Sequence, residues 1–353
     1  MKHFCTRARN IRPVRFSSTF RHITDALNDL QKTKASEEAN HAVKNGPRKQ
    51  QSRKDLQKHV ITPSDLSDHF RHSFYPKPTR AQISTTQGFF SQNKVSLEWI
   101  VGSYNDIPDI KCQDQAHGSS STANSVKTSS PPLPEVLFLG HTNAGKSSLI
   151  NNLLVNSVEN KNHNEITEHA YVSRRAGYTK TLNSYRIGNK LRLIDSPGYG
   201  EYGEEEQGEL VIDYICNRKY LRRVFVLIDS RRGFLEPDVN LVSFLIDQGV
   251  PYDIIFTKAD GIIDRYNAKK RTNTQSAGTS SSGNHASKED LVLQANQNII
   301  KYYQKIISES GIANLTTSPK ILFCNSYTSK LVKVRYGYKE IRFEILRSCG
   351  IIE

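Results

Sequence analysis

A glycine-flanked loop that ends in a lysine and a serine is the first pattern in this sequence with a clear chemical use. Residues 140–147 read Gly-His-Thr-Asn-Ala-Gly-Lys-Ser, which fits G-x-x-x-x-G-K-[ST]. In such a loop successive backbone N–H groups curl around a phosphate, and the following helix points its positive N-terminus at the same place. Lys146 would reach the β- and γ-phosphates, and the Ser147 hydroxyl would ligate Mg²⁺. The predicted phosphate-binding residues are Gly140, His141, Thr142, Asn143, Ala144, Gly145, Lys146, Ser147 and Ser148.

An aspartate at the end of a second apolar run is the predicted anchor for the metal. The tetrapeptide Asp-Ser-Pro-Gly at 195–198 directly follows the apolar run 191–194. If that run is a strand beside the one that precedes the phosphate loop, Asp195 holds Mg²⁺ through a bound water. The N–H of Gly198 then faces the γ-phosphate, so this turn can sense hydrolysis.

The polar run 174–181 lies between these two motifs and supplies the third expected magnesium ligand. We expect Thr179 to complete the Mg²⁺ shell when a γ-phosphate is present, and Thr181 is an open alternative. The predicted metal ligands are therefore Ser147, Thr179 and Asp195. The predicted catalytic residues are Lys146, Thr179 and Gly198.

A carboxylate after a third apolar run predicts which base is bound. Thr-Lys-Ala-Asp at 257–260 follows the run 254–256. The Asp260 carboxylate can accept hydrogen bonds from N1–H and the N2 amine of guanine, whereas adenine has no such donor pair. The stem of Lys258 would lie over the ring, and the turn 325–326 would offer a backbone N–H to guanine O6. The predicted ligands are GTP and GDP with Mg²⁺, and the predicted base-binding residues are Thr257, Lys258, Asp260, Asn325 and Ser326.

Short apolar runs alternate with amphipathic, helix-length segments around these motifs, which is typical of a βαβ protein. The predicted strands are 136–139, 184–187, 191–194, 224–228, 254–256 and 321–324, with a helix at 146–154. Gly188-Asn189 predicts a two-residue hairpin turn and hence an antiparallel pair. We predict an α/β fold of the P-loop NTPase type: a doubly wound, mostly parallel six-stranded sheet with one antiparallel strand, preceded by an N-terminal extension.

Composition limits the other classes to which this chain could belong. Of its 353 residues 36% are apolar, and the mean hydropathy is −0.58, so we expect part of the chain to lie outside a packed core. No apolar run approaches the roughly 18–20 residues that are needed to cross a bilayer. Five scattered cysteines without a C-x-x-C pair argue against a disulfide framework and a zinc site.

The sequence divides into three parts with different compositions. Residues 1–24 contain six Lys and Arg and no acid, which resembles a mitochondrial transit peptide, with a disordered basic arm as the alternative. Residues 25–134 are predicted to be a polar extension and linker, although the apolar residues within 61–110 could dock on a neighbouring core. The nucleotide-binding domain is expected at 135–353, with a low-complexity surface insertion at 268–287.

The net charge of +14 is concentrated in the two flanks. It is +9 up to residue 134, −2 over 135–260 and +7 over 261–353, a distribution that suits contact with a polyanion. Near the C-terminus cations alternate with aromatic residues, which predicts an RNA-contacting helix, with a solvated helix face as the alternative. The residues of this basic C-terminal segment are Lys330, Lys333, Arg335, Tyr336, Tyr338, Lys339, Arg342, Phe343 and Arg347.

Together these motifs resemble those of the EngB/YihA-type GTPases, members of the TrmE-Era-EngA-YihA-septin-like class of P-loop proteins. The resemblance is carried by GHTNAGKSSLINNLL, by DSPGYG, and by the stretch from 228–231 through 249–251 to TKAD, and it covers about residues 134–353. It implies GTP hydrolysis and a role in maturation of the large ribosomal subunit. With the transit-peptide-like start, it predicts a GTPase switch in assembly of the mitochondrial large ribosomal subunit, located in the matrix.

Three positions depart from the usual pattern of that family. His141-Thr142 replaces Arg-Ser, Ala176-Gly177 replaces Pro-Gly, and Cys-Asn-Ser-Tyr at 324–327 replaces a final Ser-Ala pair, which leaves the donor to guanine O6 open. Tyr199 stands where Ras-like enzymes carry a water-orienting glutamine, so we expect slow hydrolysis without a partner. The resemblance also implies that Asn143 could help to coordinate K⁺, which makes K⁺ a further candidate cofactor.

The expected partners are the rRNA and proteins of the mitochondrial large ribosomal subunit, besides GTP and GDP. We expect a monomer without a transmembrane segment, and peripheral contact with the inner membrane stays open. Two alternative functions remain. One is a catalytically weak GTP-binding scaffold for mitochondrial translation factors. The other is a GTPase acting in tRNA modification, although such proteins usually carry an additional large domain for which this chain has no room.

Overall fold

The computed structural model describes residues 59–111, 132–155, 180–199, 205–275, 288–312 and 319–353. The chain divides into the units 1–53 and 54–353, and every described residue belongs to the second. The predicted transit peptide and the start of the extension therefore lie outside the described residues, as do most of the linker and Thr179. None of the described helices is long and apolar enough to cross a membrane.

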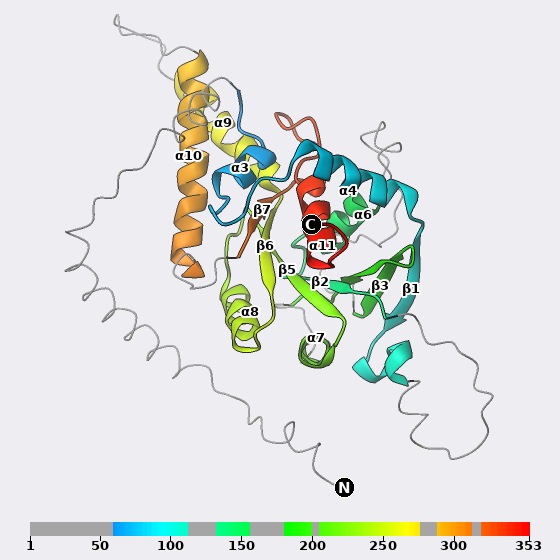
Figure 1. The fold of residues 1–353 in the computed structure, drawn as a ribbon. Coiled ribbons are helices and arrows are strands. Elements are labelled where there is room, and N and C mark those ends of the chain that lie inside the picture. Colours follow the sequence, from blue (N-terminus) through cyan, green and yellow to red (C-terminus); the bar gives the residue numbers. More distant parts are fainter. Residues whose placement is uncertain (1–58, 112–131, 156–179, 200–204, 276–287, 313–318) are drawn as a thin grey trace, which may run out of the picture. The chain divides into compact units, whose positions relative to one another are not determined.

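A mixed seven-stranded sheet forms the centre of the second unit (Figure 1). The strand order is β1-β3-β4-β2-β5-β6-β7. The strands are β1 (Val95–Val101), β2 (Glu135–Gly140), β3 (Leu182–Ile187), β4 (Leu191–Asp195), β5 (Leu221–Asp229), β6 (Tyr252–Thr257) and β7 (Ile321–Phe323). Only β3 runs against its neighbours, and β4, β2, β5, β6 and β7 pair in parallel. The predicted doubly wound α/β fold with one antiparallel strand is confirmed.

Helices cover both faces of the sheet because the central strands are apolar on both sides. Along β2 the side chains of Val136 and Phe138 enter one apolar layer, and those of Leu137 and Leu139 enter the other. The first layer is closed by α4 (Arg80–Gln92), α6 (Lys146–Leu154) and α11 (Tyr338–Ser348). The second is closed by α3 (Pro63–His69), α7 (Glu205–Asn217), α8 (Glu236–Asp247), α9 (Ala259–Gln275) and α10 (Lys288–Glu309).

Three details differ from the sequence-based expectation. The sheet has seven strands instead of six, because the extension contributes β1, which pairs with β3. Ile187 pairs directly with Leu191, so the hairpin turn contains three residues and not two. The helix α9 continues through residues 268–275, the first part of the predicted low-complexity insertion, and the remaining residues 276–287 lie outside the described part of the chain.

The extension supplies one edge strand of the sheet and contacts the other edge strand. At one edge β1 pairs with β3, and at the other the Ser67 hydroxyl of α3 accepts a hydrogen bond from the backbone N–H of Phe323 in β7 (2.9 Å). Unpaired edge strands expose backbone donors and acceptors that invite association with other chains. The segment 59–111 therefore gives β3 a pairing partner at one end of the sheet, and at the other end it gives β7 a hydrogen-bond acceptor.

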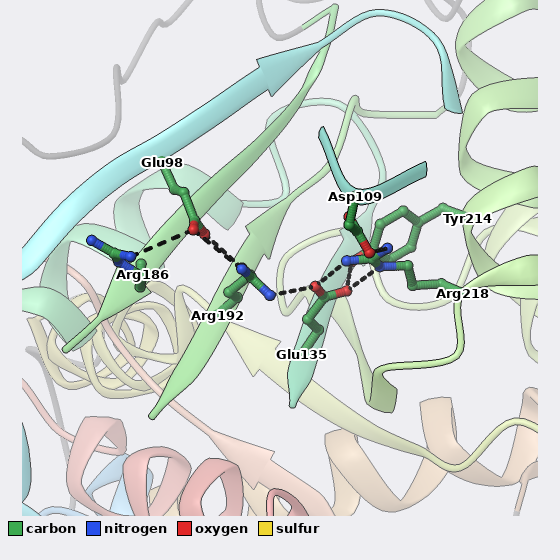
Figure 2. A network of polar contacts seen from close by, with 7 residues as sticks. All are labelled: Glu98, Asp109, Glu135, Arg186, Arg192, Tyr214 and Arg218. Carbon is green, nitrogen blue, oxygen red and sulfur yellow. Dashed lines mark hydrogen bonds and ion pairs between the residues drawn. The ribbon is translucent and has the colours of Figure 1, made fainter. Parts of the chain in front are cut away.

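A buried charge network joins the extension to the amino ends of the strands (Figure 2). Glu98 lies at an irregularity between Leu97 and Trp99 of β1, and a bulge of this kind redirects a side chain. Its carboxylate accepts two hydrogen bonds from Arg192 of β4, at 2.5 and 3.1 Å. Arg192, in turn, lies 3.3 Å from Glu135 of β2, which is fully buried.

The network continues on the other side of Glu135. Arg218, which follows α7, donates to both oxygens of Glu135 (2.5 and 2.6 Å) and to Asp109 of the extension (2.7 Å). Burial by itself lowers the pKa of Arg218, but the hydrogen bonds that it donates to Glu135 and Asp109 outweigh this effect and raise that pKa. With Arg186 near Glu98, three carboxylates face three guanidinium groups, so the network is electrically balanced.

Replacing Arg192 by Met should lower the free energy of unfolding by about 3 kcal/mol, because Glu98 and Glu135 lose a buried partner. The matched control is Lys305→Met, since the pair of Lys305 with Glu309 is exposed and should contribute less than about 1 kcal/mol. Urea unfolding of both variants measures the difference. Equal costs for the two substitutions would show that the buried network adds no stability.

Candidate nucleotide-binding site

Parallel pairing brings the predicted motifs to the same side of the sheet, at the carboxyl ends of its strands. The motifs follow β2, β4, β6 and β7, which all end on this side. In open α/β sheets ligands bind outside the carboxyl ends of the strands. The phosphate loop, the Asp195 turn, the 257–260 turn and the 325–326 turn therefore meet in one region although the sequence separates them.

The phosphate loop has the backbone conformation that its glycine requires. Gly145 immediately precedes α6 and has φ +96°, a left-handed conformation that side chains disfavour. Lys146 begins α6, and its ammonium donates to the carbonyl of Gly140 at 2.9 Å. Burial lowers the pKa of Lys146 to about 8, although Asp195 opposes this shift. An anionic ligand would relieve the cost of this buried cation.

The predicted metal anchor lies directly beside this loop. The Ser147 hydroxyl of α6 donates to one oxygen of Asp195 at 2.9 Å. The other oxygen, Oδ1, is buried and has no hydrogen-bond partner among the described residues. Burial raises the pKa of Asp195 to about 6, although Lys146 and Ser147 act in the opposite direction. An unpartnered carboxylate oxygen beside a hydroxyl suits a hydrated Mg²⁺ ion, whose ligands are oxygen atoms.

The turn after β4 packs against the phosphate loop. A Cβ atom at Gly198 would lie 2.8 Å from Cα of Thr142, so only glycine allows this approach. The N–H of Thr142 donates to the carbonyl of Tyr199 at 2.9 Å. The Tyr199 hydroxyl donates to Asp238 of α8 at 2.7 Å, so the side chain in the expected glutamine position is already engaged.

The 257–260 turn is tied to the same loop by two hydrogen bonds. The Thr257 hydroxyl donates to the carbonyl of Ala144 (2.6 Å), and the Lys258 ammonium donates to the carbonyl of Asn143 (2.5 Å). Asp260 is the second residue of α9, and burial raises its pKa. These contacts bring the turn that is predicted to select the base against the phosphate loop, as a single nucleotide site requires.

Sequence reasoning did not assign a role to Asp229, the last residue of β5. Its carboxylate accepts a hydrogen bond from Lys258 at 2.8 Å and another from Arg231 at 2.8 Å. Burial raises the pKa of Asp229, but these hydrogen bonds outweigh it and lower the pKa to about 2. The position of Asp229 at the carboxyl end of a strand next to β6 was the signal that could have identified it.

The 325–326 turn, which is predicted to offer a backbone N–H to guanine O6, is held by hydrogen bonds within its own loop. The Asn325 side chain donates to two loop carbonyls and accepts from a loop amide, so it braces the loop and is not available to a base. Its own N–H points to the carbonyl of Tyr336 at 3.4 Å. Ser326 lies beside α6, because its carbonyl accepts from Asn152. The predicted donor to guanine O6 is therefore narrowed to the N–H of Ser326.

Two cations of the basic C-terminal segment have structural roles instead of the predicted RNA contact. Arg342 is 1% exposed and donates to the carbonyls of Leu153 and Val155 at the end of α6 (2.6–2.9 Å). The last carbonyls of a helix have no partner within the helix, and Arg342 supplies one. Arg335 is 5% exposed and donates to Asn152 of the same helix.

The fold and this site define a P-loop nucleotide-binding protein of the GTPase class. A family described as 50S ribosome-binding GTPase matches residues 135–258. MIOREX complex component 8 of Saccharomyces cerevisiae is 33% identical over 295 residues, which cover 81% of this chain and 80% of the yeast protein. The chain belongs to the EngB-type family of ribosome-binding GTPases.

Further relatives match the nucleotide-binding region. The probable GTP-binding protein EngB of Rickettsia felis is 41% identical over 140 residues, which cover 38% of this chain and 61% of the bacterial protein. The match therefore spans less than two thirds of that relative. A crystal structure described as a probable GTP-binding protein engB aligns with 61% of this chain and 98% of its own, at a TM-score of 0.35 and 17% identity.

Replacing Asp229 by Asn should weaken GDP binding by about tenfold, because Lys258 loses a charged partner. The lowered pKa keeps Asp229 ionised above about pH 4, and its contribution is lost only as the pH falls through about 2, so the deficit should be the same at pH 5.5 and pH 8. Dissociation rates of a fluorescent GDP analogue measure this deficit in GDP binding. Asp247→Asn, at an exposed position of α8, is the control; a deficit as small as in this control would contradict the role.

Replacing Asp260 by Asn should exchange guanine for xanthine specificity. The asparagine amide can donate to O2 of xanthine, whereas it repels the N2 amine of guanine, so GTP affinity should fall at least about tenfold. Competition between GTP and XTP for the variant measures the exchange. Unchanged preference for GTP would show that Asp260 does not read the base.

Proposed function

We propose that this protein hydrolyses GTP as a switch during assembly of the mitochondrial large ribosomal subunit. The observation that carries the proposal is the convergence of Lys146, Asp195 and Lys258 on one phosphate loop in a member of the EngB-type family. The acid-free, arginine-rich start supports import into the mitochondrial matrix. GTP would order the Thr179 and Gly198 segments for docking, and hydrolysis would release the protein as a monomer.

The proposed turnover is slow in the free protein. The Tyr199 hydroxyl is bound to Asp238, which leaves the turn without the water-orienting group that a glutamine supplies. Asn143 is exposed within the phosphate loop with φ +64°, so its side chain is accessible to a K⁺ ion near the phosphates. Lys146 and Mg²⁺ held by Ser147, Asp195 and Thr179 would stabilise the charge that develops on the phosphates.

Single-turnover hydrolysis in KCl and in NaCl, each with and without large-subunit particles, tests this proposal. We expect the fastest turnover with KCl and particles together, because each supplies a group that the free site lacks. Equal rates in all four conditions would contradict assisted turnover. Binding of GTP without turnover in any condition would instead favour a nucleotide-binding scaffold.

A sedimentation profile of mitochondrial extract tests the proposed partner. With a non-hydrolysable GTP analogue the protein should follow large-subunit particles, because the γ-phosphate then keeps the docking segments ordered. With GDP it should remain near the top of the gradient. A profile that follows small-subunit particles, or one that is indifferent to the nucleotide, would contradict the proposal.

A further inference from the structure

The loop between β7 and α11, residues 324–337, presents exposed cations together with an exposed aromatic ring. Tyr327 is 60% exposed. Lys330 and Lys333 of the loop and Lys339 at the start of α11 are exposed as well. The stretch 325–339 contains four cations and no acid. Among the ion pairs between described residues none involves these lysines, which are Lys330, Lys333 and Lys339.

The loop is braced from inside, so these side chains are presented by a fixed backbone. The side chain of Asn325 forms hydrogen bonds of 2.8–3.0 Å with backbone atoms of Tyr327, Val334 and Tyr336. The carboxylate of Asp264 in α9 accepts from the N–H groups of Lys330 and Leu331 at 3.1 and 3.0 Å. Its charge therefore faces the loop backbone.

The same loop borders the nucleotide site. Its first turn contains Ser326, the candidate donor to guanine O6, and both ends of the loop contact Asn152 of α6. Arg335 makes the second of these contacts and is buried. Because α6 begins at the phosphate loop, this surface is attached to the helix whose first residues are predicted to bind the nucleotide. Arg335 and Arg342 are buried and out of reach of a partner, whereas Lys330, Lys333 and Lys339 are exposed.

We propose that this loop and the start of α11 form an RNA-contacting surface, in which Lys330 and Lys333 of the loop and Lys339 of α11 bind backbone phosphates and Tyr327 stacks on an unpaired base. Lysine–phosphate contacts combined with aromatic stacking are the usual means of binding single-stranded nucleic acid. Protein interface cores are depleted in lysine, which favours RNA over a protein partner. The inference rests on the proposed function and specifies which part of the protein would meet rRNA.

The test measures how tightly three variants of the full chain bind a protein-free single-stranded RNA oligonucleotide over a range of salt concentrations. The charge-reversed variant K330E/K333E/K339E should bind at least about tenfold more weakly and reduce the salt-dependence slope by about 2, since each phosphate contact contributes roughly 0.7 for single strands. Y327L should lose about fivefold or more in affinity, whereas Y327F should bind like the parent. Retained GDP binding shows that each variant is folded.

The matched control is K94E/K190E/K219E, which changes the charge by the same amount at three exposed lysines. These three lysines precede β1, β4 and β5, at the amino ends of the strands and thus on the side of the sheet opposite the nucleotide site. Its affinity should stay within about threefold of the parent, because general charge effects are screened by salt. Equal losses in the control and the loop variant would overturn the proposal, since net charge alone would explain both.

Binding to large-subunit particles separates this inference from the proposed function. Loop variants that bind protein-free RNA like the parent but lose particle binding would overturn the RNA assignment in favour of a protein partner. If the parent binds RNA through this loop but does not follow large-subunit particles, the proposed function fails while the RNA surface stands. Loss of both RNA and particle binding in the loop variants, with the control unaffected, is the expected result.

Discussion

The arrangement of the site depends on two opposite charges that are buried side by side, Lys146 and Asp195. Burial lowers the pKa of the lysine and raises that of the aspartate, so the protein alone does not fully compensate either charge. Oδ1 of Asp195 remains without a partner among the described residues. The parallel pairing of β2 with β4 keeps the two groups together, and a phosphate with Mg²⁺ would supply the missing partners.

Buried charge is compensated differently at the amino ends and at the carboxyl ends of the strands. At the amino ends three carboxylates and three guanidinium groups satisfy one another, and the extension contributes Glu98 and Asp109 to that balance. At the carboxyl ends Asp229 pairs with Lys258 and Arg231, but Lys146 and Asp195 lack full compensation within the protein. The segment 59–111 is thus part of the folded unit, since it adds the strand β1 beside β3, bonds to β7 through Ser67 and completes the balanced network.

The basic residues of the C-terminal segment differ in burial, and their roles differ accordingly. Arg342 caps α6 and Arg335 binds Asn152, which together hold the helix that begins at the phosphate loop. Lys330 and Lys333 stay exposed on the braced loop, and Lys339 stays exposed at the start of α11. The buried guanidinium groups find oxygen acceptors on α6, whereas Arg347 of the same segment is exposed and pairs with Glu344.

The sequence by itself determined the order of the motifs, the central strands and the P-loop, because these depend on local backbone requirements and on continuous apolar runs. It did not place β1 in the sheet: residues 95–99 alternate apolar and polar side chains as a strand does, but the partner strand β3 is distant in sequence and was selected by tertiary contact. Nor could it assign Asp229 to Lys258 or Asn325 to its own loop, because those partners are set by the spatial proximity of chain segments. Whether an arginine is buried or exposed was likewise decided by tertiary packing, because burial depends on which elements meet and not on the residue type.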